Sequence, residues 1–136
     1  MNNFEMLANF RMPRIDLSEI EWPKFDFAKI QWSRMPKLRI GDSAAKLPII
    51  QGGMGVGISL SGLASAVANE GGIGVIAANS IGMLDPDYYA THKDANVIAL
   101  RKEIRKAKEM SSGLICVNIM VAVNDFSALL QVAIEE

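Results

Sequence analysis

Short apolar runs alternate with helical apolar patterns along the chain from residue 41 onward. Residues 47–51, 73–78 and 114–121 are apolar runs of strand length, and glycine or polar residues flank each of them. The first run leads into a glycine-rich turn over residues 52–57. Strands that alternate with helices are typical of a parallel sheet. The pattern therefore predicts an α/β fold with the element order β-α-β-α-β-α.

Three helices are expected, one after each strand. Ser59 is the expected N-cap of the first helix, and the glycines at 71 and 72 end it. The second helix is expected over 97–110, after a long loop over 79–95, and Asp125 is expected to cap the third. The apolar residues that share one face at helical spacing are Leu60, Leu63, Ala64, Val67 and Ala68 in the first helix, Val97, Leu100, Ile104 and Ala107 in the second, and Phe126, Leu129, Leu130, Ala133 and Ile134 in the third.

Residues 1–40 follow a different pattern, a weak repeat of ten residues that runs through 10–39. Apolar residues recur within each unit, and Pro13, Pro23 and Pro36 prevent a long helix because proline lacks the N–H donor. The pattern predicts an extended N-terminal arm. This arm either packs over its own domain or docks on a partner or a membrane surface, for which aromatic side chains beside lysine and arginine are suited.

The composition supports this division and excludes several classes of protein. All 11 glycines lie from residue 41 onward, so we expect an arm over 1–40 and a domain over 41–136. Half of the residues are hydrophobic, which excludes a disordered chain. With 14 basic and 15 acidic residues, the net charge of −1 excludes a strongly basic nucleic-acid binder. The single cysteine excludes an intramolecular disulfide. No signal peptide or transmembrane segment is evident, and a cytoplasmic location is expected.

The glycine-rich turn is the first candidate for chemistry. Glycine lets backbone N–H groups approach a ligand closely, and the N-terminus of a following helix favours anions. The spacing does not satisfy G-x-G-x-x-G, because Ile58 and Leu60 stand where a third glycine would be, and G-x-x-x-x-G-K-[ST] is absent as well. The turn therefore either contacts a ligand or is a tight connection that packs only against its neighbours.

Asn118 is the second candidate. It interrupts the apolar run 114–121, so we expect its amide to be buried and to need hydrogen-bond partners. It lies toward the carboxyl end of its strand, where open sheets and (β/α)₈ barrels bind ligands. Asn118 is therefore either a ligand contact or a structural amide that neighbouring backbone groups satisfy.

The remaining reactive residues favour no site. His92 is the only histidine, so imidazoles cannot form a triad or a multi-histidine metal site, and we expect it in a solvated loop. Cys116 is expected to be a small buried hydrophobe on its strand. No metal site and no general base are predicted. The cationic residues expected on the solvated face of the second helix are Arg101, Lys102, Arg105, Lys106 and Lys108.

Two stretches together resemble a known family. Residues 48–57 (PIIQGGMGVG), continued by 63–76 (LASAVANEGGIGVI), resemble the opening of the nitronate monooxygenases, formerly called 2-nitropropane dioxygenases. Residues 117–120 (VNIM) with the helix over 125–136 resemble the third βα unit of that family. Both stretches are also similar to the related FMN-dependent enoyl-acyl-carrier-protein reductases.

The resemblance implies a fold, a cofactor and site residues. The fold would be the first three βα units of a (β/α)₈ TIM barrel that binds FMN at its carboxyl-end mouth. The backbone of Gly52, Gly53 and Met54 would lie against the flavin, and the Asn118 side chain would hydrogen-bond it. In the family's monooxygenases, the flavin takes an electron pair from an alkyl nitronate and passes it to O₂, which gives a carbonyl compound and nitrite.

A complete barrel takes about 250 residues, so the chain is expected to be the N-terminal portion of one. Catalytic residues are then expected downstream of Glu136, and the chain alone is expected to be inactive. Two other interpretations stay open. One is an enoyl-thioester reductase that uses a nicotinamide donor. The other is a non-catalytic half-barrel that binds a partner chain.

Overall fold

The computed structural model describes residues 35–86 and 88–136 of the chain. The ten-residue repeat falls almost entirely outside these residues, so the arm stays a prediction. Strands β1 (Leu38–Ile40) and β2 (Ser43–Ala45) form an antiparallel hairpin, with Leu38 opposite Ala45. This hairpin spans the position at which the composition of the chain changes.

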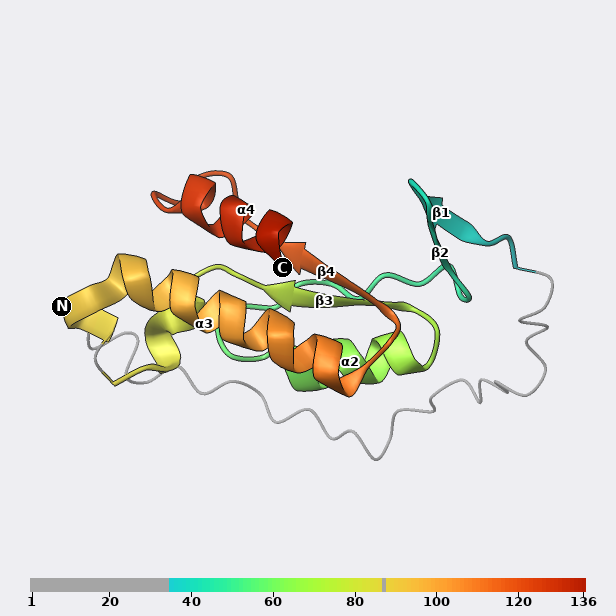
Figure 1. Ribbon diagram of the computed structural model, residues 1–136, viewed down its shortest axis with the longest axis horizontal. Coiled ribbons are helices and arrows are strands. Elements are labelled where there is room, and N and C mark those ends of the chain that lie inside the picture. Colours follow the sequence, from blue (N-terminus) through green and yellow to red (C-terminus); the bar gives the residue numbers. More distant parts are fainter. Residues whose placement is uncertain (1–34, 87) are drawn as a thin grey trace, which may run out of the picture. The chain divides into compact units, whose positions relative to one another are not determined.

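A parallel sheet forms the centre of the domain (Figure 1). Strand β3 (Ile73–Ala77) pairs in parallel with β4 (Leu114–Asn118), with Ala77 opposite Asn118 at their carboxyl ends. The segment 47–51 is predicted as a strand but does not form one, because residues 47 and 48 lie in a bend and only the last residues run beside the other edge of β3. It forms a single parallel bridge between Ile50 and Ile73, supported by hydrogen bonds of 2.8 Å from Ile73 N to Ile49 O and 3.0 Å from Gln51 N to Ile73 O.

Helices follow each of these three segments. They are α2 (Ser61–Asn69), α3 (Tyr88–Met110) and α4 (Phe126–Glu135), and α3 contacts both α2 and α4 (Figure 1). The predicted loop over 79–95 is wrong, because it contains the 3₁₀ helix η4 (Ile81–Leu84) and the first turns of α3. Residues 88–96 lack an apolar stripe, so hydrophobic periodicity does not predict a helix there. They contain no glycine or proline that would stop a helix, and α3 therefore extends through them.

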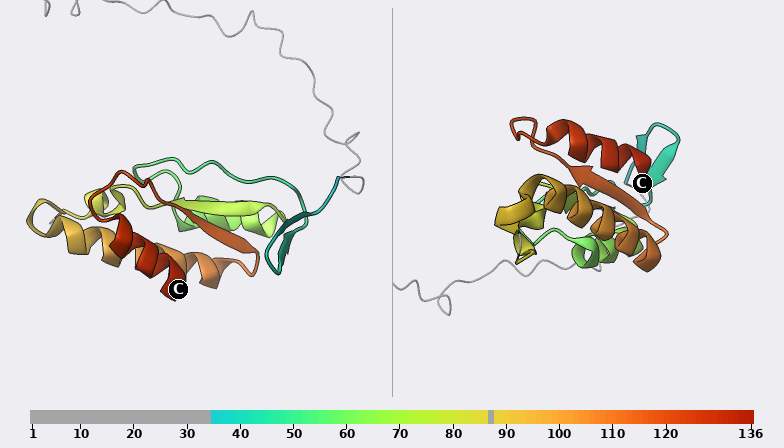
Figure 2. Two further views of the ribbon diagram at one scale, coloured as in Figure 1. Left: turned by 90° about the horizontal axis from the view of Figure 1, so that it is seen from above. Right: turned by 60° about the vertical axis from the view of Figure 1, so that its left-hand side comes forward.

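The two faces of β3 pack against different partners. Ile76 and Ala78 join the apolar residues of the helices, among them Leu100 and Leu129, in one core cluster. Ile73 and Val75 point to the other face, where they pack with Ala45 of the hairpin and with Leu38 and Leu114. The turned views in Figure 2 place the hairpin near the end of the sheet where β3 and β4 begin. The loops that follow the strands lie at the opposite, carboxyl end of the sheet.

The predicted helix faces are right for α3 and partly wrong for α2 and α4. Leu100, Ile104 and Ala107 are buried as expected. In α4, Leu129 is buried, but Val132 takes the place of the exposed Leu130 and Ile134. The buried face of α2 is made of the small residues Ser61, Ala64, Ser65 and Ala68, whereas Leu63 is exposed.

Close packing against the sheet explains the small residues of α2. A Cβ atom on Gly74 of β3 would collide with the backbone carbonyl of Ala64, so helix and strand approach each other through glycine and alanine. Larger residues do not fit between the two elements. Among the described residues, no helix has both the length and the apolar character that crossing a bilayer would need.

Candidate functional site

Gly53 and Asn118 meet at the carboxyl end of the sheet. Asn118 is the last residue of β4, and Gly53 follows the segment 47–51. A Cβ atom on Gly53 would lie 2.6 Å from the Cβ of Asn118 and 2.9 Å from its Cγ. Only glycine allows this approach, because real Cβ atoms do not come so close to other heavy atoms. The structure thus brings two of the predicted site residues into direct contact.

The side chain of Asn118 is exposed, and the prediction that it is buried is wrong. The physical reason is that β4 pairs only with β3 among the described residues, so its other edge is open. The backbone carbonyl of Asn118 accepts a 3.0 Å hydrogen bond from Ala78 N. Within the described residues the side-chain amide has no hydrogen-bond partner, so its two donors and its acceptor are available to a ligand.

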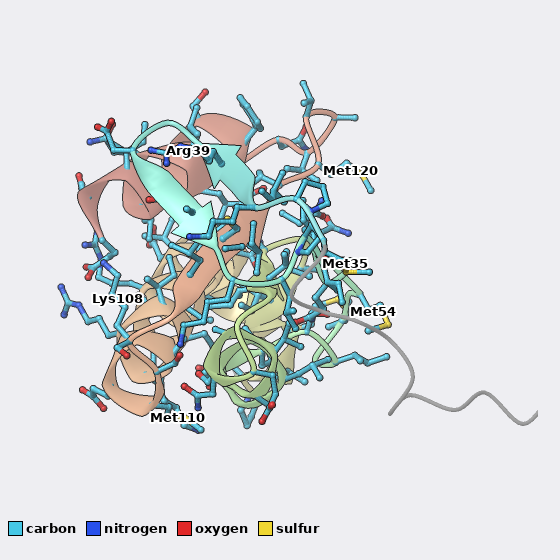
Figure 3. The ribbon with its side chains drawn as sticks, turned by 90° about the vertical axis from the view of Figure 1, so that its right-hand side faces the viewer. Met35, Arg39, Met54, Lys108, Met110 and Met120 are labelled. Carbon is cyan, nitrogen blue, oxygen red and sulfur yellow. The ribbon has the colours of Figure 1, made fainter. Side chains whose placement is uncertain are left out.

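The other two predicted contacts, Gly52 and Met54, are exposed in the same loop. The space around Gly52 is open, since a Cβ atom there would meet nothing within 4 Å. The Met54 side chain is 45% exposed, and that of Met120, two residues beyond Asn118, is 53% exposed. Figure 3 shows both methionines pointing outward on the same side of the molecule. The site therefore combines exposed peptide groups, one free amide and polarizable apolar side chains.

Ser59 organises this loop, a role that the sequence analysis missed. The helix begins after Leu60, so Ser59 is not the N-cap, and its hydroxyl is completely buried. The hydroxyl oxygen accepts hydrogen bonds from Met54 N (2.9 Å) and Gln51 Nε2 (3.0 Å), and the hydroxyl donates to Gly52 O (3.4 Å). The Ser59 N–H in turn donates to Met54 O at 2.9 Å.

Gln51 is the second residue that the sequence analysis missed. Its side-chain amide pairs with the backbone of Val75 in β3, with 3.1 Å from Nε2 to Val75 O and 3.2 Å from Val75 N to Oε1. The amide therefore continues the sheet pairing after the main chain has turned away into the glycine-rich loop. A polar residue at the end of the apolar run 47–51 was the signal that could have identified it.

A second polar network holds the loop that follows β4. Asn96 of α3 is buried, accepts a 2.8 Å hydrogen bond from Gly82 N, and donates a 2.7 Å hydrogen bond to the Asp125 carboxylate. Asp125 is the N-cap of α4 as predicted, but its carboxylate bonds Asn96 rather than the first N–H groups of the helix. Asn96 thus joins η4 to the start of α4.

Two of the other candidates, His92 and Cys116, are placed differently from the expectation. His92 belongs to α3 rather than to a loop, and its side chain is among those not described. Cys116 is exposed rather than buried, although partial desolvation still raises the pKa of its thiol. Arg101 and Arg105 are engaged with the carboxylates of Glu135 and Glu136.

Comparison with known proteins decides the family. A sequence model of the nitronate monooxygenase family matches residues 37–133. The chain belongs to the nitronate monooxygenase family. The match covers β1 through most of α4 and therefore includes the loop over 52–57 and Asn118. A search of curated proteins finds no match for the chain. Nitronate monooxygenases are oxidoreductases that act on small molecules, and the mixed α/β fold agrees with this membership.

Proposed function

We propose that the chain forms the flavin-contacting part of an FMN-dependent oxidoreductase that oxidises alkyl nitronates with O₂ to a carbonyl compound and nitrite. The observation that carries the proposal is the contact between Gly53 and Asn118 at the carboxyl ends of the two parallel segments that flank β3. Ligands of open α/β sheets and of (β/α)₈ barrels bind at this end. The family membership supplies the reaction class.

The residues at this end fit a flavin. The ring system of FMN has a polar edge that hydrogen-bonds amides and a flat apolar body. Asn118 offers a free side-chain amide, the loop at Gly52 and Gly53 offers exposed peptide groups, and Met54 offers an apolar side chain. When bound, FMN supplies the electron-pair chemistry, while the protein binds and orients it. None of the described residues is assigned a catalytic role.

We further propose that the described elements are the first three βα units of a (β/α)₈ barrel. The segment 47–51, β3 and β4 lie in this order as parallel neighbours, and each is followed by a helix. Barrels of this type carry their helices outside and a packed core inside. The helix-facing cluster around Ile76 would then lie between the barrel and its helices, and Val75, Cys116 and Asn118 would point inward.

The reaction is tested with the complete gene product, purified with its flavin. The proposal predicts nitrite release and O₂ consumption when an alkyl nitronate is added. If NADH or NADPH reduces the flavin rapidly without O₂ and nitronates release no nitrite, the activity is enoyl-thioester reduction instead. If the product contains no flavin and has the mass of the 136-residue chain, a non-catalytic half-barrel replaces both.

A further inference from the structure

The Ser59 hydroxyl fixes one peptide group of the glycine-rich loop. Its oxygen accepts from Met54 N and from Gln51 Nε2, and its hydrogen is directed to Gly52 O, so its hydrogen-bonding capacity is used in full. The side chain is completely buried, so loss of the hydroxyl would leave buried hydrogen-bonding groups without a partner, which destabilises the loop. Ser59 and Met54 also share the bond from Ser59 N to Met54 O.

This arrangement determines how the peptide between Gly53 and Met54 is turned. The described residues contain no cis peptide bond, and a trans peptide directs its N–H and its C=O in opposite directions. Because the Met54 N–H points to Ser59, the Gly53 carbonyl points away from Ser59. Gly53 N–H has no partner among the described residues. One buried hydroxyl thus decides which groups of the loop face inward and which stay free.

Gln51 anchors that hydroxyl to the sheet. Its Nε2 atom donates both to Ser59 Oγ and to Val75 O, and its Oε1 atom accepts from Val75 N. The backbone carbonyl of Ser59 also accepts a 2.9 Å hydrogen bond from Ala77 N, two residues further along β3. These bonds fix the orientation of the exposed loop relative to β3, which is buried along its whole length.

We propose that Ser59 is a positioning residue for the flavin, held by Gln51: its hydroxyl orients the Gly53–Met54 peptide that binds the ring. This inference rests on the proposed function, because the peptide it orients is the one placed against FMN there. Ser59 itself touches no ligand in this account. Removing a group that orients a metal ligand typically costs about 10- to 100-fold in affinity, and we expect an effect at the lower end of that range here.

The test compares two buried serines of the complete gene product. Ser59→Ala removes the hydroxyl that holds the loop. Ser65→Ala is the matched control, because Ser65 is equally buried and loses a 3.2 Å bond to Ala107 O of α3, away from the glycine-rich loop. FMN is titrated into each flavin-free protein, and the visible absorption spectrum of the bound flavin is recorded.

Ser59→Ala is expected to weaken FMN binding by about tenfold, equivalent to about 1.4 kcal/mol, and to shift the spectrum of the bound flavin. Ser65→Ala is expected to match the wild type in both. If Ser59→Ala also matches the wild type while Gly53→Val loses FMN, the positioning role is wrong and the proposed function stands. If the wild-type protein binds no FMN, the proposed function fails and the inference fails with it.

A second variant and a measurement on the wild type cover the case in which Ser59→Ala does not fold. Gln51→Met keeps the side-chain length and removes the anchor of the hydroxyl, so it should weaken FMN binding in the same direction but by less. Wild-type affinity in Gln51→Met would overturn the inference. In the flavin-free wild type, hydrogen exchange at Met54 N–H should be much slower than at Gly53 N–H, and equal rates would overturn it as well.

Discussion

The side chain of Asn118 lies directly against Gly53, so closely that a Cβ atom on Gly53 would be 3.1 Å from Asn118 Oδ1 and closer still to Cβ and Cγ. The two residues come from different βα units of the fold. Their contact joins the free amide of β4 to the glycine-rich loop, and it makes the geometry of each dependent on the other.

Gly53→Val is expected to abolish flavin retention. The new side chain would displace Asn118 and disturb the loop, because the nearest atoms belong to a residue fixed at the end of β4. The measurement is the ratio of flavin to protein absorbance in the purified complete gene product. Gly62→Ala is the control, since Gly62 is an exposed helical glycine with nothing within 4 Å of a Cβ atom. Gly62→Ala should keep its flavin and gain up to about 1 kcal/mol in stability.

Asn118→Ala is expected to weaken FMN binding by about 1–3 kcal/mol through loss of a hydrogen-bonding group. Its stability should change little, because the amide is exposed and bonds no other described residue. The affinity is measured by quenching of FMN fluorescence on titration. Asn69→Ala serves as the control, since Asn69 is also exposed and its amide bonds only Met110 O, at 3.3 Å. Unchanged affinity in Asn118→Ala would remove Asn118 from the site.

Gly74→Ala is expected to destabilise the fold by about 1–3 kcal/mol, the range for overpacking in a core. The added methyl group would collide with the backbone carbonyl of Ala64, which cannot move without shifting α2. Urea unfolding followed by circular dichroism measures the effect. A midpoint equal to that of the wild type would show that α2 packs less closely against β3 than the structure has it.

Acid should weaken the contact between α3 and α4. Hydrogen bonds from Arg105 and then Arg101 lower the pKa of Glu136 from its ordinary value of 4.5 to about 2. Because the folded-state pKa lies below the unfolded one, this contribution to stability is complete above pH 4.5 and is lost as the pH falls toward 2. Unfolding midpoints measured between pH 6 and pH 2 should therefore fall less steeply in Glu136→Gln. The difference should shrink in high salt, since the Arg105 side chain that bonds Glu136 is 61% exposed. If the unfolding midpoints of the wild type and of Glu136→Gln fall equally steeply with pH, Glu136 does not stabilise the contact between α3 and α4.

Periodicity and strand-end placement could be predicted from the sequence, and relationships between distant segments could not. The strand β3 and the buried face of α3 follow from local apolar spacing. Asn118 was placed correctly toward the carboxyl end of its strand, but β4 ends at Asn118 and not at residue 121, as the apolar run predicted. The burial of Asn118 was mispredicted because burial depends on what lies beside the strand. The face of α2 was mispredicted because small residues carry a weak signal, and their burial depends on Gly74 of another element. The role of Gln51 could not be predicted, because its amide replaces a backbone pairing with β3.

The most direct test of the flavin site follows the Asn118 side chain itself. In the complete gene product labelled with ¹⁵N-asparagine, the side-chain NH₂ resonances are recorded while FMN is added, and the Asn118 signal is assigned by its absence in Asn118→Ala. The account predicts that this signal shifts in proportion to FMN occupancy. The signal of Asn69, at the carboxyl end of α2, should stay in place. An unmoved Asn118 signal in protein that has bound FMN would contradict the site.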